Sequence, residues 1–531
     1  MIGFASLENK FGVSPFLLAA RMAALAEGDR RGFARMDHSI KHLFGGTTVV
    51  AWKGDMDRVI TGLVTDSRRV IPGAMFFAVD GSRVSGADFI EEAIGRGAVA
   101  VVTTQPPSKH TPVTWVQVPD VRLALAAVAR NFYRDPDEAL FLAGVTGTNG
   151  KTTVAMMTQF LLRDPDAPCG LIGTVRYEIG QRTLPSYKTT PESVDLYALF
   201  DQMREAGCHA CAMEVSSHAL DQARVQGVHF DAVAFTNLTQ DHLDYHKTLE
   251  GYFAAKVRLF TGELGHRASI AVVNVDDPHG RVLVERIPNG VKVITYGFSA
   301  SANLRATNVV LSPGGSQCDV EWSGGRARLQ LGLPGRYNIL NALCALGLAS
   351  ADGRDFANLV PRLVEFSGVP GRMEKIEIGQ PFQVLVDYAH TDDALTHALT
   401  MLRDVCAGRL LVVFGCGGNR DRAKRPRMTA AVQRWADFAW ATADNPRKEP
   451  LAQIFDDMRA GLTASDRLRF VDDRRRAIAL ALEAARPGDC LLIAGKGHET
   501  YQEFADTVTP FDDRQVVREL LQLRYFPPSQ L

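Results

Sequence analysis

Residues 144–153 read Gly-Val-Thr-Gly-Thr-Asn-Gly-Lys-Thr-Thr. This run overlaps the end of an apolar segment, FLAGV at 141–145, and precedes residues that favour a helix from about Lys151. A glycine-rich turn between a strand and a helix directs backbone N–H groups at phosphate oxygens, and the helix dipole adds to the attraction. The stretch therefore predicts a nucleotide-binding loop, although Val145 stands where the common spelling G-x-x-x-x-G-K-[ST] has glycine.

Apolar runs of strand length continue on the C-terminal side of the loop, and helical stretches separate several of them. This alternation predicts a parallel sheet with helices on its faces. Residues 303–331 alternate polar and apolar side chains and read as antiparallel strands, and a helix is expected from about Tyr337. The runs before Gly368 are CAMEV (211–215), AVAFT (232–236), SIAVVN (269–274) and VKVITYG (291–297), and those after it are QVLVDYA, RLLVVFG, FAWATAD and DCLLIAG.

These patterns predict an α/β protein of three domains. We expect an N-terminal α/β domain over 1–138, a central domain with a phosphate-loop parallel sheet over 139–368, and a Rossmann-like α/β domain over 369–531. Asp135-Pro136-Asp137 is a plausible first boundary and Gly368-Val369-Pro370-Gly371 a hinge. Residues 1–50 carry no motif that assigns them.

Bulk properties narrow the classes of function. A formal net charge of -1 does not favour nucleic acid or a membrane surface as partner. The eight cysteines have no disulfide-like spacing, and Cys208 and Cys211 read as structural residues. No apolar run reaches the length of a membrane span, and no signal peptide is evident, so we expect a cytoplasmic protein.

Strand ends downstream of the loop carry metal-compatible side chains. In such loops the lysine, here Lys151, reaches the β- and γ-phosphates and the following Thr152 holds Mg²⁺. Glu214 ends one predicted strand, and His242 lies a few residues after the next. Because ligands bind at the carboxyl ends of parallel strands, both side chains could converge on a metal beside the loop. Taken singly, each could instead be a solvated strand end or a structural histidine.

Six segments, in chain order, bear a resemblance to one family: TGTNGKTT, MEVSSHAL, TNLTQDHLDYH, GRYNILN, VPGRME and VDYAHT. Together they resemble the Mur ligases of peptidoglycan synthesis, and the similarity runs from about Asp66 to the C-terminus. The valine-containing loop is similar to that of the Mur and folylpolyglutamate ligases. The resemblance implies an enzyme that uses ATP to convert a carboxylate into an acyl phosphate, from which an amine displaces phosphate to form an amide.

The resemblance also implies roles for individual residues. Thr152 and Glu214 would hold Mg²⁺, and His242 would support a second ion. Lys256 stands where several Mur ligases carry a carbamylated lysine that can ligate or steady Mg²⁺, although spacing alone favours an ordinary surface lysine. Asp387 and His390 would complete the catalytic set when the C-terminal domain closes. ATP contacts fall on Gly147, Thr148, Asn149, Gly150, Lys151, Thr152, Thr153, Asn338, Asn341 and Arg372.

Two further groups of residues are similar to substrate sites of the ligases that add the third residue of the peptide. The first would bind a UDP-linked muramoyl dipeptide: Thr65, Ser67, Ser82, Arg83, Val84, Lys188, Thr189, Thr190, Ser216, Gln222 and Arg224. The second would bind meso-diaminopimelate: Arg420, Asp444, Asn445, Pro446, Arg447, Gly495 and Glu499. A guanidinium can grip the extra carboxylate that distinguishes this amino acid from lysine.

The expected function is therefore ATP-dependent addition of meso-2,6-diaminopimelate to the D-glutamate of UDP-N-acetylmuramoyl-L-alanyl-D-glutamate, by a monomer. The alternatives are a lysine-adding Mur ligase, a folate-type glutamate ligase, and a P-loop ATPase or nucleotide-binding regulator without ligase activity. Lys188 stands where some relatives carry Asn, and Lys448-Glu449-Pro450 departs modestly from the residues that usually follow the Asp-Asn-Pro-Arg segment.

Overall fold

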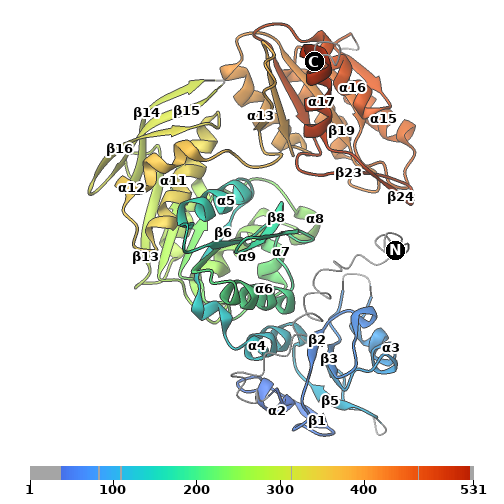
Figure 1. Ribbon diagram of the computed structural model, residues 1–531. Coiled ribbons are helices and arrows are strands. Elements are labelled where there is room, and N and C mark those ends of the chain that lie inside the picture. The colour runs from blue at the N-terminus through green and yellow to red at the C-terminus, as the bar shows by residue number, and fades with distance from the viewer. Residues whose placement is uncertain (1–37, 82–83, 108–110, 313, 464–465, 527–531) are drawn as a thin grey trace. The chain divides into compact units, whose positions relative to one another are not determined.

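The computed structural model describes residues 38–81, 84–107, 111–312, 314–463 and 466–526 (Figure 1). The chain divides into two compact units, one of residues 1–45 with 49–117 and the other of residues 46–48 with 118–531. Within the described ranges no helix is both long and apolar enough to cross a membrane.

The first unit contains a five-stranded sheet in the order β1-β5-β4-β3-β2. Strands β2 to β5 are parallel, and β1 pairs antiparallel at one edge. Strands β3 and β4 are buried along their whole length, as expected for a sheet with both faces covered. The elements are α2 Ile40–Leu43, β1 Ala51–Lys53, β2 Gly62–Val64, β3 Ala74–Phe77, α3 Ile90–Gly95, β4 Ala100–Thr103 and β5 Thr114–Gln117.

The second unit begins with α4 (Val121–Tyr133) and continues into an eleven-stranded sheet in the order β16-β15-β14-β13-β12-β11-β6-β10-β7-β8-β9. Its middle is parallel, whereas β8, β9, β15 and β16 run antiparallel to their neighbours. The strands are β6 Phe141–Thr146, β7 Cys169–Ile172, β8 Arg176–Ile179, β9 Arg182–Pro185, β10 Ala210–Glu214, β11 Ala232–Phe235, β12 Ile270–Asn274, β13 Lys292–Gly297, β14 Leu304–Ser312, β15 Gly315–Trp322 and β16 Gly325–Leu331.

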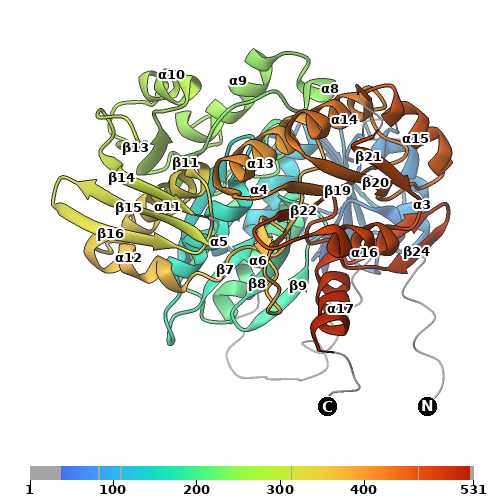
Figure 2. The same cartoon turned by 90° about the horizontal axis from the view of Figure 1, so that it is seen from above.

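Helices cover this sheet. In the main core α5 packs beside β6 and β10, and α11 packs against α5 and strands β11 to β15. Both views show α11 and α12 beside the β14–β16 meander (Figures 1 and 2). The antiparallel strands predicted over 303–331 and the helix predicted from about Tyr337 are confirmed. The helices are α5 Lys151–Leu162, α6 Ser193–Glu205, α7 Ser217–Asp221, α8 Leu243–His246, α9 Leu249–Thr261, α10 Pro278–Arg286, α11 Arg336–Ser350 and α12 Phe356–Arg362.

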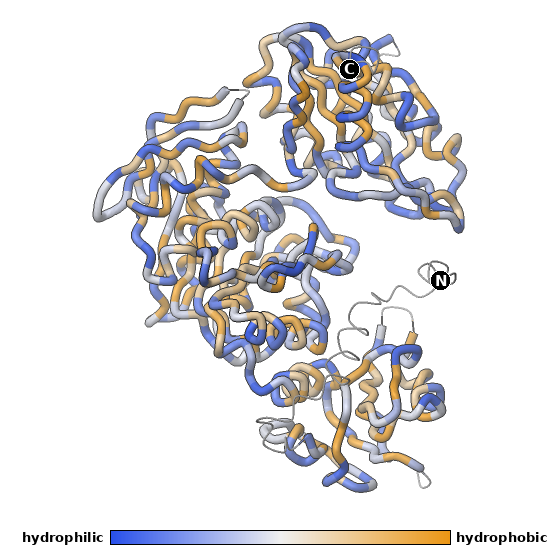
Figure 3. The backbone as a smooth tube through the Cα atoms, viewed as in Figure 1, coloured by the Kyte–Doolittle hydropathy of each residue, from blue (hydrophilic) through white to orange (hydrophobic). Residues whose placement is uncertain are grey.

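The C-terminal part has its own sheet, in the order β17-β18-β22-β19-β20-β21, and its own cores on the two faces. Its strands are mostly hydrophobic along the tube in Figure 3, which is why they lie inside a helix-covered sheet. The elements are β17 Glu374–Lys375, β18 Gln383–Asp387, α13 Asp392–Val405, β19 Leu410–Cys416, α14 Lys424–Trp435, β20 Phe438–Ala443, α15 Leu451–Arg459, β21 Leu468–Val471, α16 Arg474–Ala484, β22 Cys490–Ala494, β23 Tyr501–Phe504, β24 Thr507–Pro510 and α17 Asp513–Tyr525. The predicted three-domain α/β architecture is confirmed.

Candidate active site

The glycine-rich loop lies at the middle of the central sheet. Strand β6 runs between β10 and β11, and Val145 is in register with Glu214 on one side and with Ala234 on the other. The carboxyl ends of the three strands therefore meet at one edge, as the sequence predicts. Val145 belongs to the buried strand, so the turn itself is confined to residues 147–150.

Two positions of this turn require glycine. Gly147 and Gly150 have φ values of 150° and 86°, which side chains of L-residues rarely adopt. A Cβ at Gly147 would overlap the Thr236 hydroxyl, and one at Gly150 would overlap the Asn341 side-chain oxygen. The close approach of Asn341 places this residue of α11 beside the loop.

A neighbouring segment, 236–239, braces the loop. The Asn149 N–H donates to Asn237 Oδ1 at 2.9 Å, and the Thr236 hydroxyl donates to the Asn149 carbonyl at 2.7 Å. The Thr239 N–H donates to the Thr148 hydroxyl at 3.0 Å. These contacts fix the shape of the turn. Thr236, Asn237 and Thr239 were not among the predicted site residues, although they lie inside the segment TNLTQDHLDYH.

Two lysines share one carbonyl of the loop. The Lys151 ammonium donates to the Gly147 carbonyl at 3.0 Å, and the Lys256 ammonium of α9 donates to the same oxygen at 2.8 Å. Lys256 is only 1% exposed, and its nitrogen lies 4.3 Å from the centre of the Tyr252 ring. Desolvation and the nearby Lys151 cation lower the pKa of Lys256 well below its usual value. Lys256 is therefore not a surface lysine, and its amine is poised to be neutral.

Glu214 is fixed beside the first turn of α5. Its carboxylate accepts hydrogen bonds from the Thr152 hydroxyl at 3.0 Å and from the Thr174 N–H at 2.7 Å, and the residue is 1% exposed. A hydroxyl and a carboxylate are hard oxygen donors of the kind that Mg²⁺ prefers, so the pair fits a magnesium ion.

His242 contacts other residues than this pair. It precedes α8 with a φ of 54°, and its side chain is 45% exposed. Its imidazole faces Asp241 at 3.4 Å and the His218 ring at 4.8 Å, and none of its contacts reaches Glu214. In the ranges that the structure describes, no three His, Cys, Asp or Glu side chains are grouped to hold a metal. The structure thus joins Thr152 with Glu214 by a hydrogen bond. Burial and the nearby His218, Lys151 and Lys256 lower the pKa of His242, and its support of a second metal ion stays a prediction.

The residues predicted to hold the muramoyl dipeptide form a connected cluster in the central domain. Glu192 pairs with the Lys188 ammonium at 2.7 Å and with the Arg224 guanidinium at 3.1 Å. Although burial opposes the shift, these cations lower the pKa of Glu192. Further bonds join Thr189 to Thr174 at 3.0 Å, the Ser216 N–H to the Thr190 hydroxyl at 3.0 Å, and Arg224 to Gln222 at 2.7 Å.

The predicted ATP residues outside the loop fall into two places. On α11 the Asn341 amide donates to Asn338 at 3.2 Å, and both residues are buried. In the C-terminal domain the Arg372 guanidinium lies 4.7 Å from the Tyr388 ring centre. Asp387 ends β18 and accepts the Met373 N–H at 2.7 Å, and desolvation raises its pKa. The last of these residues, His390, follows Asp387 by three positions and is exposed.

The predicted amino-acid site is a second set of strand ends, after β20 and β22. Fully buried Lys496 donates to Asn445 at 3.1 Å and to Glu499 at 2.9 Å, and Asn445 donates to Glu499 at 2.9 Å. Gly495, with a φ of 114°, approaches the Asp444 carboxylate so closely that a side chain would collide with it. The structure therefore brings Asp444, Asn445, Gly495 and Glu499 together. Lys496 was not among the predicted site residues.

Arg447 is held by partners of its own. It adopts a φ of 54°, its guanidinium pairs with Glu503 of β23 at 2.9 Å, and it donates to the Gly418 carbonyl at 3.0 Å. Pro446, just before it, contributes a carbonyl that leaves no room for a side chain at Gly418. Arg420 lies two residues after Gly418, in the loop that follows β19, and is exposed.

In the first unit, the predicted uridine residues are only partly described. The Ser67 hydroxyl donates to Glu92 at 2.7 Å and is buried. Thr65 is half-buried and Val84 is 55% exposed. Ser82 and Arg83 lie outside the described residues.

Comparison with known proteins finds the same order of domains. Residues 59–133 match the description "Mur ligase family, catalytic domain", residues 145–349 "Mur ligase middle domain", and residues 371–497 "Mur ligase, glutamate ligase domain".

Several relatives that match most of the chain share one name. UDP-N-acetylmuramoyl-L-alanyl-D-glutamate–2,6-diaminopimelate ligase of Solibacter usitatus is 43% identical over 87% of this chain and 94% of its own. The protein of that name from Geobacillus thermodenitrificans is 45% identical over 88% and 95%. A solved structure with the same name superposes with a TM-score of 0.67 at 33% identity, covering 92% of this chain and all of its own.

Proposed function

The chain belongs to the Mur ligase family, and from that premise we propose that it joins meso-2,6-diaminopimelate to the D-glutamate of UDP-N-acetylmuramoyl-L-alanyl-D-glutamate at the expense of ATP. The observation that carries this proposal is the Asp444–Arg447 segment at the end of β20, where the Asn445 amide donates to Glu499 at 2.9 Å.

The chemistry follows from the weakness of a carboxylate as an electrophile. A carboxylate oxygen of the D-glutamate attacks the γ-phosphorus of ATP, and ADP leaves. The amine of diaminopimelate then attacks the acyl carbon, phosphate leaves with the acyl C–O bonding pair, and the nitrogen loses a proton. Both steps bring anions together, so cations and N–H donors at the site must offset their repulsion.

The loop supplies those donors. Backbone N–H groups of residues 150–152 and the Lys151 ammonium bind the phosphates. The N–H groups of Thr148 and Asn149 donate to Asn237 instead, and these two hydrogen bonds keep the loop in shape. When bound, Mg²⁺ adds positive charge at the phosphates, and Thr152 with Glu214 would hold it. Asn338, Asn341 and Arg372 contact the nucleotide, and Asp387 and His390 reach it from the C-terminal domain.

Lys256 carries a carbamate in this proposal. Its neutral amine adds to CO₂ and releases a proton, which converts a buried cation into an anion. Burial beside the Lys151 cation, with a carbonyl as hydrogen-bond acceptor, favours the neutral amine that the reaction needs. The carbamate would then stand beside Lys151 and could steady the magnesium ion.

Substrate selection is divided between the domains. Lys188, Thr189, Thr190, Ser216, Gln222 and Arg224 hold the muramoyl dipeptide, and Thr65, Ser67, Ser82, Arg83 and Val84 take its uridine diphosphate end. Arg447 and Arg420 bind the distal carboxylate of diaminopimelate, while Glu499 faces its ammonium.

An assay of ADP formation tests the proposal directly. We expect ADP release only when the UDP-linked dipeptide and diaminopimelate are both present, with L-lysine a poor substitute. Equal use of lysine would favour the lysine-adding alternative. ADP release that neither substrate affects would favour a P-loop ATPase.

A further inference from the structure

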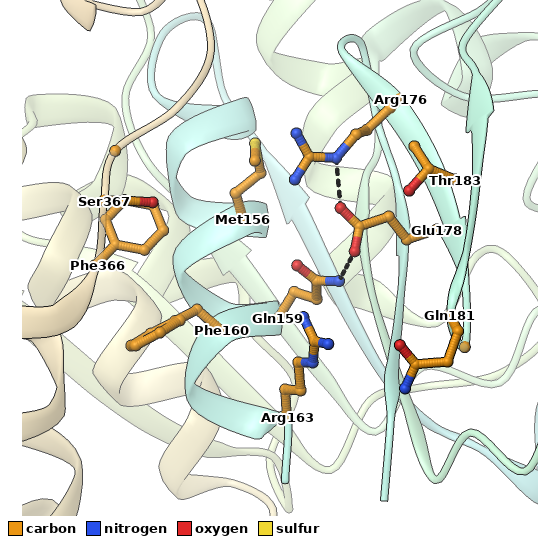
Figure 4. A pocket seen from close by; sticks show the side chains of 12 residues that line it. Met156, Gln159, Phe160, Arg163, Arg176, Glu178, Gln181, Thr183, Phe366 and Ser367 are labelled. Carbon is orange, nitrogen blue, oxygen red and sulfur yellow. Dashed lines mark hydrogen bonds and ion pairs between the residues drawn. The ribbon is translucent and has the colours of Figure 1, made fainter. Parts of the chain in front are cut away.

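A cavity of about 450 Å³ lies in the central domain, away from the strand ends that form the active site. Three segments enclose it: the second half of α5, the β8–β9 hairpin and residues 366–368 (Figure 4). Arg163 at its lower end lies about 18 Å along the α5 axis from Lys151, at 1.5 Å per residue. The volume is within the range of small-molecule sites.

One side of the cavity is apolar. Met156 and Phe160 project from α5, and Phe366 packs edge-to-face on Phe160 with ring centres 5.6 Å apart (Figure 4). Met156 and Phe366 are almost fully buried, so the thioether chain of the first and the ring of the second are held in place by the core behind them. A flat ring or short apolar chain could lie against this wall.

The other side is polar and carries a net positive charge. Glu178 of β8 is neutralised by an ion pair with Arg176 and by a hydrogen bond from buried Gln159 at 2.6 Å. The second arginine, Arg163, has no hydrogen bond or ion pair to its guanidinium within the described residues. Two arginines and one glutamate line the cavity, which leaves one positive charge for a ligand to balance.

We propose that this cavity is a second ligand site, and that it takes a small organic anion with an apolar ring. The anionic group, a carboxylate or a phosphate, pairs with Arg163, and the ring lies against Met156, Phe160 and Phe366. This site is additional to the substrate sites of the proposed ligase reaction.

The three enclosing segments connect the cavity to the active site. Thr174, just before β8, donates to Glu214, and the β8–β9 hairpin leads into Lys188 and Thr189. Gly368 begins the hinge that precedes the C-terminal domain. A ligand that touches all three segments restrains them, so its binding should alter the ligase rate without occupying the phosphate loop.

Titration calorimetry with phenyl phosphate and with benzoate tests the proposal on the full chain. We expect at least one of them to bind in the low millimolar range or tighter, whereas inorganic phosphate and benzyl alcohol bind much more weakly. Which of the two anions binds better distinguishes a phosphate from a carboxylate ligand. All titrations are repeated in Lys151→Ala, where binding should persist because that substitution disables only the phosphate loop.

Variants locate the binding. Arg163→Ala should weaken it at least tenfold, since one charge-assisted contact is lost, and Arg182→Ala on the same hairpin, which removes the same charge outside the cavity, should leave it unchanged. Thr183→Trp, at an exposed strand position, should fill the cavity and also abolish binding. Equal affinities in Arg163→Ala and Arg182→Ala, loss of binding in Lys151→Ala, or no binding of either anion would each overturn the proposal.

Discussion

The loop at the end of β6 and the Asp444–Arg447 segment at the end of β20 are both strand ends in parallel sheets, yet their charges are arranged differently. At the loop, Lys151 and Lys256 donate to carbonyl oxygens, and among the described residues no carboxylate accepts a hydrogen bond from either nitrogen. At the C-terminal segment, Arg447 pairs with Glu503 and Lys496 pairs with Glu499.

This difference indicates that the two sites balance the charge of a ligand in different ways. At the loop the Lys151 ammonium donates to carbonyl oxygens and can turn to an incoming polyphosphate, so nucleotide affinity should depend directly on this cation. The amino-acid segment is already neutralised internally, so a zwitterionic substrate must exchange partners with side chains that are paired. Substitutions at the loop should therefore have larger effects on rate, and those at the segment should mainly change selectivity.

The largest effect is expected for Lys151→Ala. Loss of the phosphate-facing ammonium should lower ADP formation by at least about 1,000-fold, as for other groups that stabilise transferring phosphate. The thermal unfolding midpoint should stay near that of the parent, because Lys151 contacts only loop carbonyls. Lys292→Ala, an exposed strand lysine, is the matched control and should retain full activity. Appreciable ADP formation by folded Lys151→Ala would refute the loop assignment.

The second largest effect is expected for Arg447→Ala, on the preference for diaminopimelate over L-lysine. Loss of a bidentate contact to the distal carboxylate should cost about 2–4 kcal/mol, which reduces kcat/KM for diaminopimelate by roughly 30- to 1,000-fold. L-Lysine lacks that carboxylate, so its poor use should not worsen. Arg447→Lys should restore part of the preference, because an ammonium keeps the charge but not the planar fork.

The control for Arg447 is Arg475→Ala, which removes an exposed arginine paired with Glu519 in the same domain. It should leave the ratio of the two kcat/KM values unchanged. The same unchanged ratio in Arg447→Ala would mean that the residue only secures the strand end.

Lys256→Ala should lower turnover by about 10- to 100-fold, the range typical of groups that orient a metal site. Carbon-13 NMR of the active enzyme in labelled bicarbonate should show a carbamate resonance, and that resonance should be missing from Lys256→Ala. An unmodified ammonium in an active, magnesium-loaded enzyme would exclude carbamylation while leaving the phosphate loop unaffected.

The smallest effect is expected at Glu503, the carboxylate that pairs with Arg447 in the amino-acid segment. Glu503→Gln removes the internal partner of Arg447 but keeps the shape of the side chain. Partly exposed ion pairs are worth about 0.2–1 kcal/mol, so KM for diaminopimelate should fall by up to about fivefold. Glu519→Gln, which releases Arg475 instead, should not change KM. A higher KM in Glu503→Gln would show that Glu503 itself helps to bind the substrate.

The strand ends were predictable because local patterns determine them. Apolar runs before Glu214, Asp387 and Asp444 predict buried parallel strands, and the carboxyl ends of such strands form one edge. The helix at Lys151 and the antiparallel strands after residue 303 follow from the same periodicity.

Side-chain pairing between distant segments was not predictable in this way. Glu503 lies 56 positions after Arg447, and Asn237 lies 88 positions after Asn149 of the loop. Strand register and turn geometry bring these residues together, and no local pattern encodes either. His242 was expected beside Glu214 because both follow adjacent strands. Its left-handed backbone and its ring contacts with His218 and Tyr252 are features that no local pattern predicts.

The burial of Val145 bears on how such loops are recognised in genomes. The residue is a filled position of the sheet, paired on both sides, so a glycine there would leave a void in the core and a weaker strand. Converting this sequence to the common spelling would therefore damage the fold and give the phosphates no additional donor. A search pattern should therefore require the two glycines of the turn, Gly147 and Gly150, and should not require the first glycine of the common motif. Such a pattern would find loops of this kind.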